Sequence, residues 1–326
     1  MGNIQVYGIG NVLIDIVCPA EDSDLKLLGL DKGIMKLVEG DERDKIVNFI
    51  SSHNAEYHCG GSAPNTIITL SQLGIKSALS GKTGVDDFGS RYKEQLLSYN
   101  VVSSLNMEEG NTGSSIILVC PDGERTMNTS LENNRKFSAN DINEEAIKES
   151  DFLYFTGYMW DTENQKEAIL KAISIAKKND TTIVFDAADP FAVKRSDGKF
   201  LQLIENHFDI VLANAEEASL LFGKDNLSAC AKELSLICKI AVVKDGSRGS
   251  NITQGDNTFH IPVYKTETID STGAGDIYSA GLLYGLCQGK GIEESGNIAS
   301  KLAAGVVGQK GAQFTSEKIS EIKKSF

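Results

Sequence analysis

Residues 270–276 read Asp-Ser-Thr-Gly-Ala-Gly-Asp, and their types and spacing suit chemistry on an anion. Gly273, Ala274 and Gly275 stand between two acids, and apolar residues at helical spacing follow them. The first turn of a helix offers backbone N–H groups without intrahelical partners, together with the positive end of the helix dipole. Small residues let an anion approach those N–H groups. Asp276 would then stand beside developing negative charge, which suits a general base.

This motif predicts a phosphoryl-transfer site. The N–H groups of residues 273–275 would hold the transferring phosphoryl group, and Asp276 would take a proton from a substrate hydroxyl. The alternative is a glycine-rich loop with an acid in the first helical turn, which is common in α/β proteins. Motifs elsewhere in the chain are needed to choose between the two.

A second glycine-containing run lies in residues 57–65, which read Tyr-His-Cys-Gly-Gly-Ser-Ala-Pro-Asn. Gly60 and Gly61 allow the backbone to pass close to a ligand. An apolar helix follows, and we expect Asn65 in its first turn, facing the same cleft. His58 is expected to be a structural histidine, because no second metal ligand is suitably spaced for it.

The amino-terminal strand predicted at residues 4–9 is followed by Gly10, Asn11 and Asp15. The run resembles the start of a dinucleotide fingerprint, but Leu13 stands where the third glycine is required, so we reject that interpretation. We expect Asn11 and Asp15 to lie just past the carboxyl end of the strand, where ligands of open α/β sheets bind. An Asx turn is the alternative.

From residue 152 onward, predicted strands and helices alternate. Strands are expected at 152–156, 182–185, 209–213 and 240–243. Polar residues follow the last three: Asp186, Asn214 and Lys244. Alternation of this kind predicts a parallel sheet with helices on both faces and a binding cleft along its carboxyl edge. The predicted fold class is therefore α/β, with a mostly parallel central sheet.

Two β-prone pieces, at about 15–40 and 112–128, flank the first α/β unit and are expected to pair into a small sheet that covers the cleft as a lid. A helix is predicted at 41–51 with Asp41 as its N-cap, and an irregular loop at 128–140. No linker or internal repeat divides the chain, so residues 1–326 are read as one domain.

Lys82 lies in a Ser-Gly-Lys-Thr run that resembles a phosphate loop but lacks the first glycine of that motif, so we expect a strand end there.

Residues 214–249 contain two further candidates for contacts with a nucleotide. Asn214 can cap a helix, and Glu217 three residues later can hold Mg²⁺ directly or through water. The alternative is a plain cap with acids in the first turn. The turn at 244–249 is bounded by glycines, and a nucleotide could lie against it; a simple hairpin turn would look the same.

The composition limits the classes of partner. The 326 residues are 41% hydrophobic and 24% charged, with a net charge of −13. Nucleic acid and anionic membrane surfaces need a basic face, so neither is expected as a partner. Six scattered cysteines without a C-x-x-C pair, no signal peptide and no apolar membrane-spanning run favour a cytoplasmic protein.

Together these motifs resemble the ribokinase-like (PfkB) carbohydrate kinase family, in order and over nearly the whole chain. Residues 60–65 match its amino-terminal signature, 270–276 its carboxyl-terminal signature and 214–217 its Asn-x-x-Glu motif. Finer features resemble the adenosine kinase branch of the family; they lie at residues 10–15, 57–62, 122–125 and 157–160.

The resemblance implies roles for individual residues. The acceptor would be bound by Asn11, Asp15, Gly60, Gly61, Asn65 and Tyr158. Arg125 would reach the phosphates from the lid, Asp276 would be the base, and residues 273–275 would form the anion hole. ATP would contact Asn214, Lys244, Gly246 and Gly249. The cofactor would be Mg²⁺ at Glu217, with K⁺ as a further expectation at Asp270 and Thr272, near residues 310–312.

The resemblance also implies a three-layer α/β/α fold with a β lid, as a monomer or a homodimer joined through the lid. We therefore expect an ATP- and Mg²⁺-dependent kinase that phosphorylates a primary hydroxyl, foremost the 5′-OH of adenosine or another purine ribonucleoside. Tyr158, Met159 and Trp160 would provide a slot for the base.

Ser271 replaces the family's usual Thr, which is a mild change. Residues 128–135 are polar where the branch tends to be small and apolar, and this departure leaves the acceptor open. A ribokinase- or fructokinase-type sugar kinase with the same mechanism is thus the alternative, and guanosine and inosine also remain. A regulatory binding protein would not need Asp276, and a structural protein would leave the polar strand ends unexplained.

Overall fold

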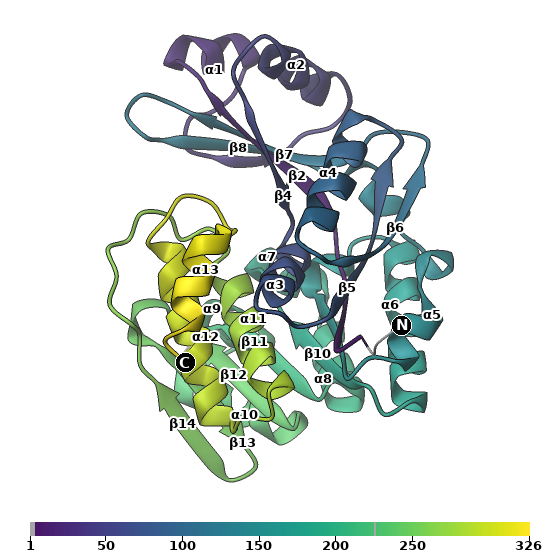
Figure 1. Ribbon diagram of the computed structural model, residues 1–326, viewed down its shortest axis with the longest axis vertical. Helices are drawn as coiled ribbons and strands as arrows, with labels where there is room; N and C mark the ends of the chain where they lie inside the picture. The colour runs from purple at the N-terminus through teal and green to yellow at the C-terminus, as the bar shows by residue number, and fades with distance from the viewer. Residues whose placement is uncertain (1–3, 225) are drawn as a thin grey trace.

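The computed structural model describes residues 4–224 and 226–326, which fold around two β-sheets (Figure 1). In the described residues the larger sheet has nine strands: β1 (Val6–Ile9), β5 (Ser77–Gly84), β6 (Val102–Glu108), β9 (Phe152–Thr156), β10 (Thr182–Asp186), β11 (Ile210–Asn214), β12 (Ile240–Lys244), β13 (Ser250–Gln254) and β14 (Asn257–Ile261). Their order is β14-β13-β12-β11-β10-β9-β1-β5-β6, and all neighbours are parallel except at β13 and β14. The predicted α/β class and its mostly parallel sheet are confirmed.

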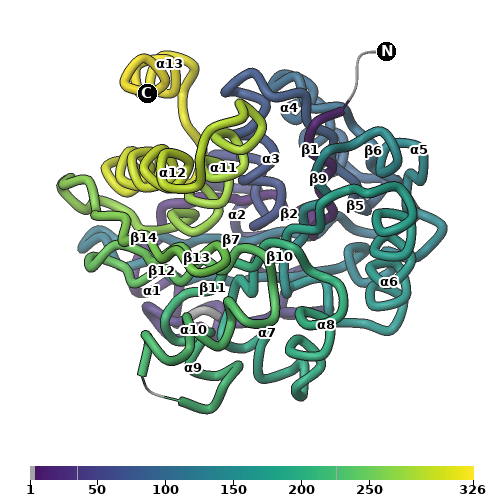
Figure 2. Tube along the Cα trace, turned by 90° about the horizontal axis from the view of Figure 1, so that it is seen from below, coloured from purple at the N-terminus to yellow at the C-terminus, as the bar shows by residue number. Residues whose placement is uncertain are grey.

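Helices cover both faces of this sheet (Figure 2). One face carries α3 (Ser62–Gln72), α4 (Asp87–Ser98), α11 (Ala274–Cys287), α12 (Ile292–Val307) and α13 (Ser316–Lys323). The other carries α5 (Glu144–Lys148), α6 (Glu163–Lys178), α7 (Pro190–Arg195), α8 (Lys199–His207), α9 (Ala215–Phe222) and α10 (Leu227–Ile237). Side chains alternate along each strand: Leu153 and Phe155 pack into one layer and Tyr154 into the other. Burial on both faces explains why these strands read as continuous apolar runs.

The smaller sheet has five described strands: β2 (Leu13–Pro19), β3 (Met35–Leu37), β4 (Glu56–Gly60), β7 (Gly113–Val119) and β8 (Arg125–Ser130). Their order is β3-β8-β7-β2-β4. Two helices, α1 (Asp22–Leu28) and α2 (Gly40–Ser51), cover one face, and Ile14, Ile16, Ile46 and Ile116 pack between helices and sheet (Figure 1). We call this unit the small sheet.

Several local predictions near the small sheet are wrong. Asp15 does not lie in a loop after β1 but inside β2, which begins at Leu13. The piece expected to be β-prone at about 15–40 also contains α1, and α2 begins at Gly40, so Glu39 rather than Asp41 is its N-cap. Residues 128–140 continue β8 and then form two 3₁₀ turns, η1 (Glu132–Lys136) and η2 (Ala139–Asp141).

Lys82 lies within β5, as the missing glycine of its run predicted. Its ammonium is 2.8 Å from Glu108 and 3.1 Å from Asp141, so it serves the sheet and not a phosphate loop. Within residues 4–224 and 226–326, no helix combines the length and apolarity that crossing a bilayer requires.

Candidate active site

The carboxylate of Asp276 lies at the centre of the predicted site. Gly273, with φ of 76°, is the N-cap of α11, and a Cβ there would come within 2.5 Å of Ala312. Asp276 stands in the first turn and accepts hydrogen bonds from Ser62 Oγ at 2.6 Å and Asn65 Nδ2 at 3.0 Å. The two glycine-containing motifs, more than 200 residues apart in sequence, therefore meet side chain to side chain.

Asp15 lies at the same site. A Cβ at residue 60 would lie 2.3 Å from the Asp15 carboxyl group, so glycine at this position makes room for that carboxyl. Burial and, after it, the charge of Asp276 raise the pKa of Asp15 to about 7, against the charge of Arg125, which lowers it. Burial also raises the pKa of Asp276 to about 7, against the hydrogen bonds from Ser62 and Asn65. Two carboxyl groups thus lie at one site with pKa values near neutrality.

The loop after β1 is fixed by amide side chains. Asn11 is buried, and its Oδ1 accepts a hydrogen bond from Gln165 Nε2 at 2.9 Å. Asn134 exchanges hydrogen bonds with both backbone groups of Val12, at 2.7 and 2.9 Å. Asn11 is therefore held by α6, and the chain entering β2 is held by η1.

Tyr158 lies in η3 (Gly157–Met159), which follows β9. Burial raises its pKa, and the charges of Asp189 and Asp276 add to the effect. Its neighbours depart from the expectation of a base slot. Met159 is fully buried in the core, and Trp160 packs edge-on against Phe200 with ring centroids 6.3 Å apart. Of the three residues expected to line the slot, only Tyr158 lies near Asp276.

Arg125, which is expected to contact the phosphates, lies next to the loop that leads into α11. Arg125, at the start of β8, forms an ion pair with Asp270, and the same carboxylate accepts N–H bonds from Thr272 at 3.0 Å and Gly311 at 3.1 Å. Burial opposes ionisation of Asp270, but these donors hold its pKa well below its usual range. Arg125 is therefore placed beside the 270–276 motif.

Asn214 and Glu217 form a reciprocal cap at the start of α9. Glu217 N–H donates to Asn214 Oδ1 at 2.8 Å, and the two Glu217 oxygens accept from the Asn214 side chain at 2.6 Å and its N–H at 2.7 Å. Glu217 is 1% exposed, and burial raises its pKa to about 7. Its oxygens fit a water-mediated approach to Mg²⁺ better than direct ligation, since each already has a donor.

Lys244 ends β12, and the turn that follows contains Gly246 and Gly249. Its 3₁₀ segment, η4 (Gly246–Arg248), is closed by an N–H bond from Asp245 to Gly249 at 2.7 Å. Lys244 does not point along this turn. Its ammonium crosses toward β10 and donates to both oxygens of Asp186.

Several site residues were not singled out from the sequence. Ser62 lies inside a motif and could have been found as the residue that opens α3. Thr66 donates to the Asp276 carbonyl oxygen at 3.0 Å, and Gln165 holds Asn11 from α6. Gln165 forms a capping box with Thr162, a pattern that marks the start of α6, but its contact with Asn11 comes only from the packing of α6 on the strand ends.

Comparisons with known proteins bear on the family and the fold. Residues 33–319 match the family model described as pfkB family carbohydrate kinase. The solved structure of an adenosine kinase from Sinorhizobium meliloti is 31% identical, with a TM-score of 0.88 over all of both chains. A probable sugar kinase from Rhizobium etli has the same identity and TM-score, and the match covers all of this chain and 99% of that one. A 5-dehydro-2-deoxygluconokinase from Listeria monocytogenes is 28% identical over 82% of this chain and 86% of its own.

Proposed function

Because this chain belongs to the pfkB family of carbohydrate kinases and is a phosphotransferase with an alcohol acceptor, we propose that it transfers the γ-phosphoryl group of ATP to a primary hydroxyl with Asp276 as the general base. The foremost acceptor is the 5′-OH of adenosine or another purine ribonucleoside. The observation that carries the proposal is the hydrogen bonding of the Asp276 carboxylate to Ser62 and Asn65 beside the open first turn of α11.

In the proposed reaction, the acceptor oxygen bonds to the γ-phosphorus as the bond to the bridging oxygen of ADP breaks. Asp276 takes the hydroxyl proton, and the N–H groups of residues 273–275 stabilise the phosphoryl oxygens. Asp15 and Asn11 hold the acceptor's hydroxyls, with Gly60, Gly61, Asn65 and Tyr158 completing its pocket. Positioning and charge stabilisation dominate such transfers, and base catalysis supplies about 10²–10⁴-fold.

ATP is proposed to lie against Asn214, Lys244, Gly246 and Gly249, with the small sheet acting as the lid. Mg²⁺ fits a site held by the phosphates and by Glu217 through water, where it would neutralise phosphate charge. Asp270 and Thr272, where K⁺ was expected, fit a cation less well than Glu217 fits Mg²⁺. Both oxygens of Asp270 already accept from Arg125, Thr272 and Gly311, so no step is assigned to K⁺.

The Sinorhizobium meliloti adenosine kinase supports a nucleoside acceptor, being 31% identical over the whole chain. A free sugar is the second candidate. It is favoured by the positions of Met159, which lies in the core, and Trp160, which packs on Phe200. Less apolar and aromatic surface is then left for a base. The Listeria relative, named for a sugar-acid substrate, supports the same alternative.

A coupled ADP-release assay over adenosine, guanosine, inosine, ribose, fructose and 5-dehydro-2-deoxygluconate tests both candidates. Turnover that depends on ATP and is highest with a purine ribonucleoside supports the first, and highest turnover with a sugar supports the second. If no member of the panel releases ADP above the acceptor-free background, the proposal fails for these acceptor classes.

A further inference from the structure

Lys244 and Asp186 form an ion pair at the carboxyl edge of the large sheet. Asp186 ends β10 and Lys244 ends β12, and their side chains meet across the end of β11, which lies between the two strands. Lys244 Nζ is 2.8 and 3.1 Å from the two carboxylate oxygens. The side chains are 15% and 3% exposed, so little water reaches the pair.

Asp186 is fixed by further donors. Ser279 Oγ, from α11, lies 2.7 Å from the Asp186 carboxylate and 3.0 Å from the carbonyl oxygen of Gly275. The N–H of Ala188 donates to the other carboxylate oxygen at 3.2 Å. Rotating this carboxylate away would remove one acceptor from Ser279, Ala188 and Lys244 together. Asp186 is therefore a rigid support for the ammonium.

The ammonium of Lys244 lies against the first turn of α11. A Cβ at residue 275 would be 3.4 Å from Nζ, so the cation borders the N–H groups expected to receive a phosphoryl group. Within the described residues, only Asp186 accepts a hydrogen bond from Lys244. A lysine ammonium has three donors, so at least one remains available to a ligand.

The surrounding charges keep this lysine protonated. Burial works to lower the pKa of Lys244, but the carboxylates of Asp186 and Glu217 raise it overall, and Asp276 adds to the effect. The site therefore holds a permanent positive charge on the side of α11 that faces the large sheet. Arg125 supplies a second one from the small sheet.

We propose that Lys244 donates directly to the transferring phosphoryl group and that Asp186 is the positioning residue that holds its ammonium beside Gly275. This inference rests on the proposed phosphoryl transfer. A cation already in place when charge develops stabilises the transition state without reorganisation at that moment. Ser279 supports the arrangement by tying Asp186 to α11, so sheet and anion pocket keep one relative position.

The kinetics of Lys244→Met and Asp186→Asn test the inference. Lys244→Met is expected to lower kcat by about 100-fold or more, in line with the loss of one preorganised transition-state donor. Asp186→Asn is expected to lower kcat by roughly 10-fold or more, because the lysine keeps its charge but loses its place. The KM of the acceptor should stay within about twofold in both, since neither side chain holds the acceptor. Asp186→Glu should restore part of the loss.

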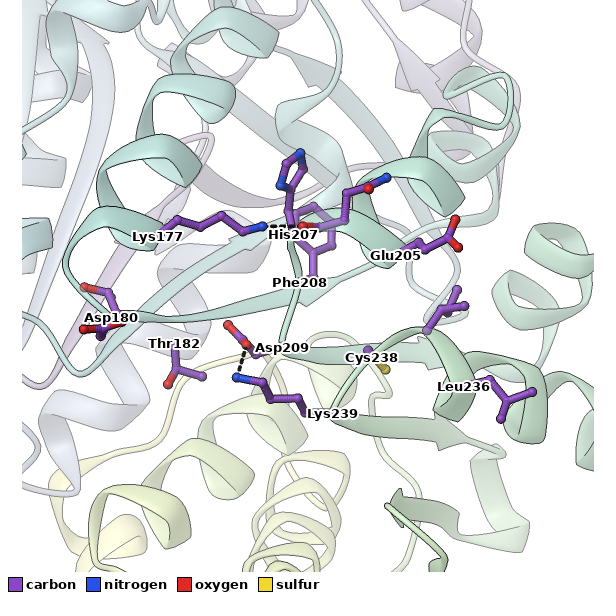
Figure 3. Close-up of a pocket in the computed structure, with 13 residues that line it drawn as sticks. Lys177, Asp180, Thr182, Glu205, His207, Phe208, Asp209, Leu236, Cys238 and Lys239 are labelled. Atoms are coloured by element: carbon purple, nitrogen blue, oxygen red, sulfur yellow. Dashed lines mark hydrogen bonds and ion pairs between the residues drawn. The ribbon is translucent and has the colours of Figure 1, made fainter.

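A matched control lies at the opposite edge of the same strands. Lys239 precedes β12 and Asp209 precedes β11, and they form an ion pair of 2.8 Å beside a surface hollow that also includes Lys177, His207 and Cys238 (Figure 3). Lys239→Met and Asp209→Asn remove a Lys–Asp pair of the same length outside the candidate site, but one whose lysine is 80% exposed where Lys244 is 15% exposed. Both should keep kcat within about twofold of wild type, by the small effects usual for surface substitutions.

The pH profile separates positioning from general damage. The charge of Asp186 raises the pKa of Asp276 and that of Lys244 lowers it. The acid limb of kcat/KM should therefore move to higher pH in Lys244→Met and to lower pH in Asp186→Asn. A merely structural defect would lower the amplitude of both profiles and leave their midpoints in place.

Calorimetry with MgATP and AMP gives a readout that does not need turnover. Lys244→Met should weaken MgATP binding by about tenfold or more, as for a lost charged hydrogen bond, and leave AMP binding unchanged. Wild-type affinity for MgATP together with wild-type kcat in folded Lys244→Met would overturn the inference. A wild-type protein whose ADP release rises above the acceptor-free background with no acceptor of the panel would instead count against the proposed function, and calorimetry would still measure the effect of Lys244→Met on MgATP binding.

Discussion

The guanidinium of Arg125 forms an ion pair with the carboxylate of Asp270. Arg125 begins β8 of the small sheet, and Asp270 begins the motif that leads into α11. The pair therefore connects the small sheet to the loop that positions the expected anion hole. Asp270 also accepts from Thr272 and Gly311, so its carboxylate organises that loop even without Arg125.

Removing either partner of this pair should slow phosphoryl transfer. Arg125→Ala is expected to lower kcat by about 10²-fold, as for a lost cation at a developing charge. Asp270→Asn should also lower kcat. The loss of charge should matter less here than in Arg125→Ala, and the disturbance of the loop that Asp270 holds through Thr272 and Gly311 should matter more. A double-mutant cycle should give a coupling energy of about 0.5–3 kcal/mol, and additive effects would show that the pair does not act as a unit.

Asp276→Asn should abolish turnover while nucleotide still binds. The amide keeps the size of the side chain but cannot take a proton, and base catalysis supplies about 10²–10⁴-fold. ADP release and MgATP calorimetry measure the two properties separately. Glu293→Gln removes an exposed acid from the first turn of α12 and serves as the control. A near wild-type rate in Asp276→Asn would contradict the role of base.

The rate should fall in acid with a midpoint near neutrality. Burial raises the pKa of Asp276 to about 7, and the base acts only when ionised. Below that pH, kcat/KM should therefore drop by about tenfold per pH unit, and above it the profile should level off. A profile that stays flat down to pH 5 would contradict the assignment. The profile of Asp15→Asn shows whether the second carboxyl contributes to the same limb.

Asp15→Asn should stabilise the fold at alkaline pH. The folded pKa of about 7 lies above the ordinary value of 3.8, so the folded protein binds the extra proton between these values. Ionising Asp15 therefore removes stability as pH rises from about 4 to 7. We expect Asp15→Asn to have a higher Tm than wild type at pH 8, with a gain of up to about 4 kcal/mol in the free energy of unfolding, and we expect the difference to vanish near pH 4. The same variant should raise the acceptor's KM and leave that of ATP unchanged.

Gly60→Ala should damage acceptor binding more than stability. The added Cβ would lie 2.3 Å from the Asp15 carboxyl group, which must move away from the cleft. An increase in acceptor KM of about tenfold or more is expected, as for one displaced charged hydrogen bond. Gly291→Ala adds the same methyl group where no heavy atom lies within 4 Å, and its kinetics should match wild type.

Periodicity and turn chemistry were enough to predict the parallel centre of the large sheet and its juxtaposed strand ends, but not the outer strands β6, β13 and β14. The strands from residue 152 onward are buried on both faces, so their apolar runs are long and bounded by polar residues. The small sheet was harder to predict. Asp15 alternates with Ile14 and Ile16 in β2, and β4 ends in glycines, so neither strand shows a continuous apolar run. The support given by Asp186 and Gln165 depends on strand order and helix packing, which no local pattern encodes.

The two faces of the small sheet are both in use. Helices α1 and α2 pack over one face, and the other presents Asp15 and Arg125 toward the strand ends of the large sheet. Face-to-face stacking with a second copy, as two sheets stack in a sandwich, would have to expel the helices or block the cleft. Any self-association through this unit is therefore confined to its borders at β3 and β4, where pairing would extend the sheet sideways and leave both surfaces as they are.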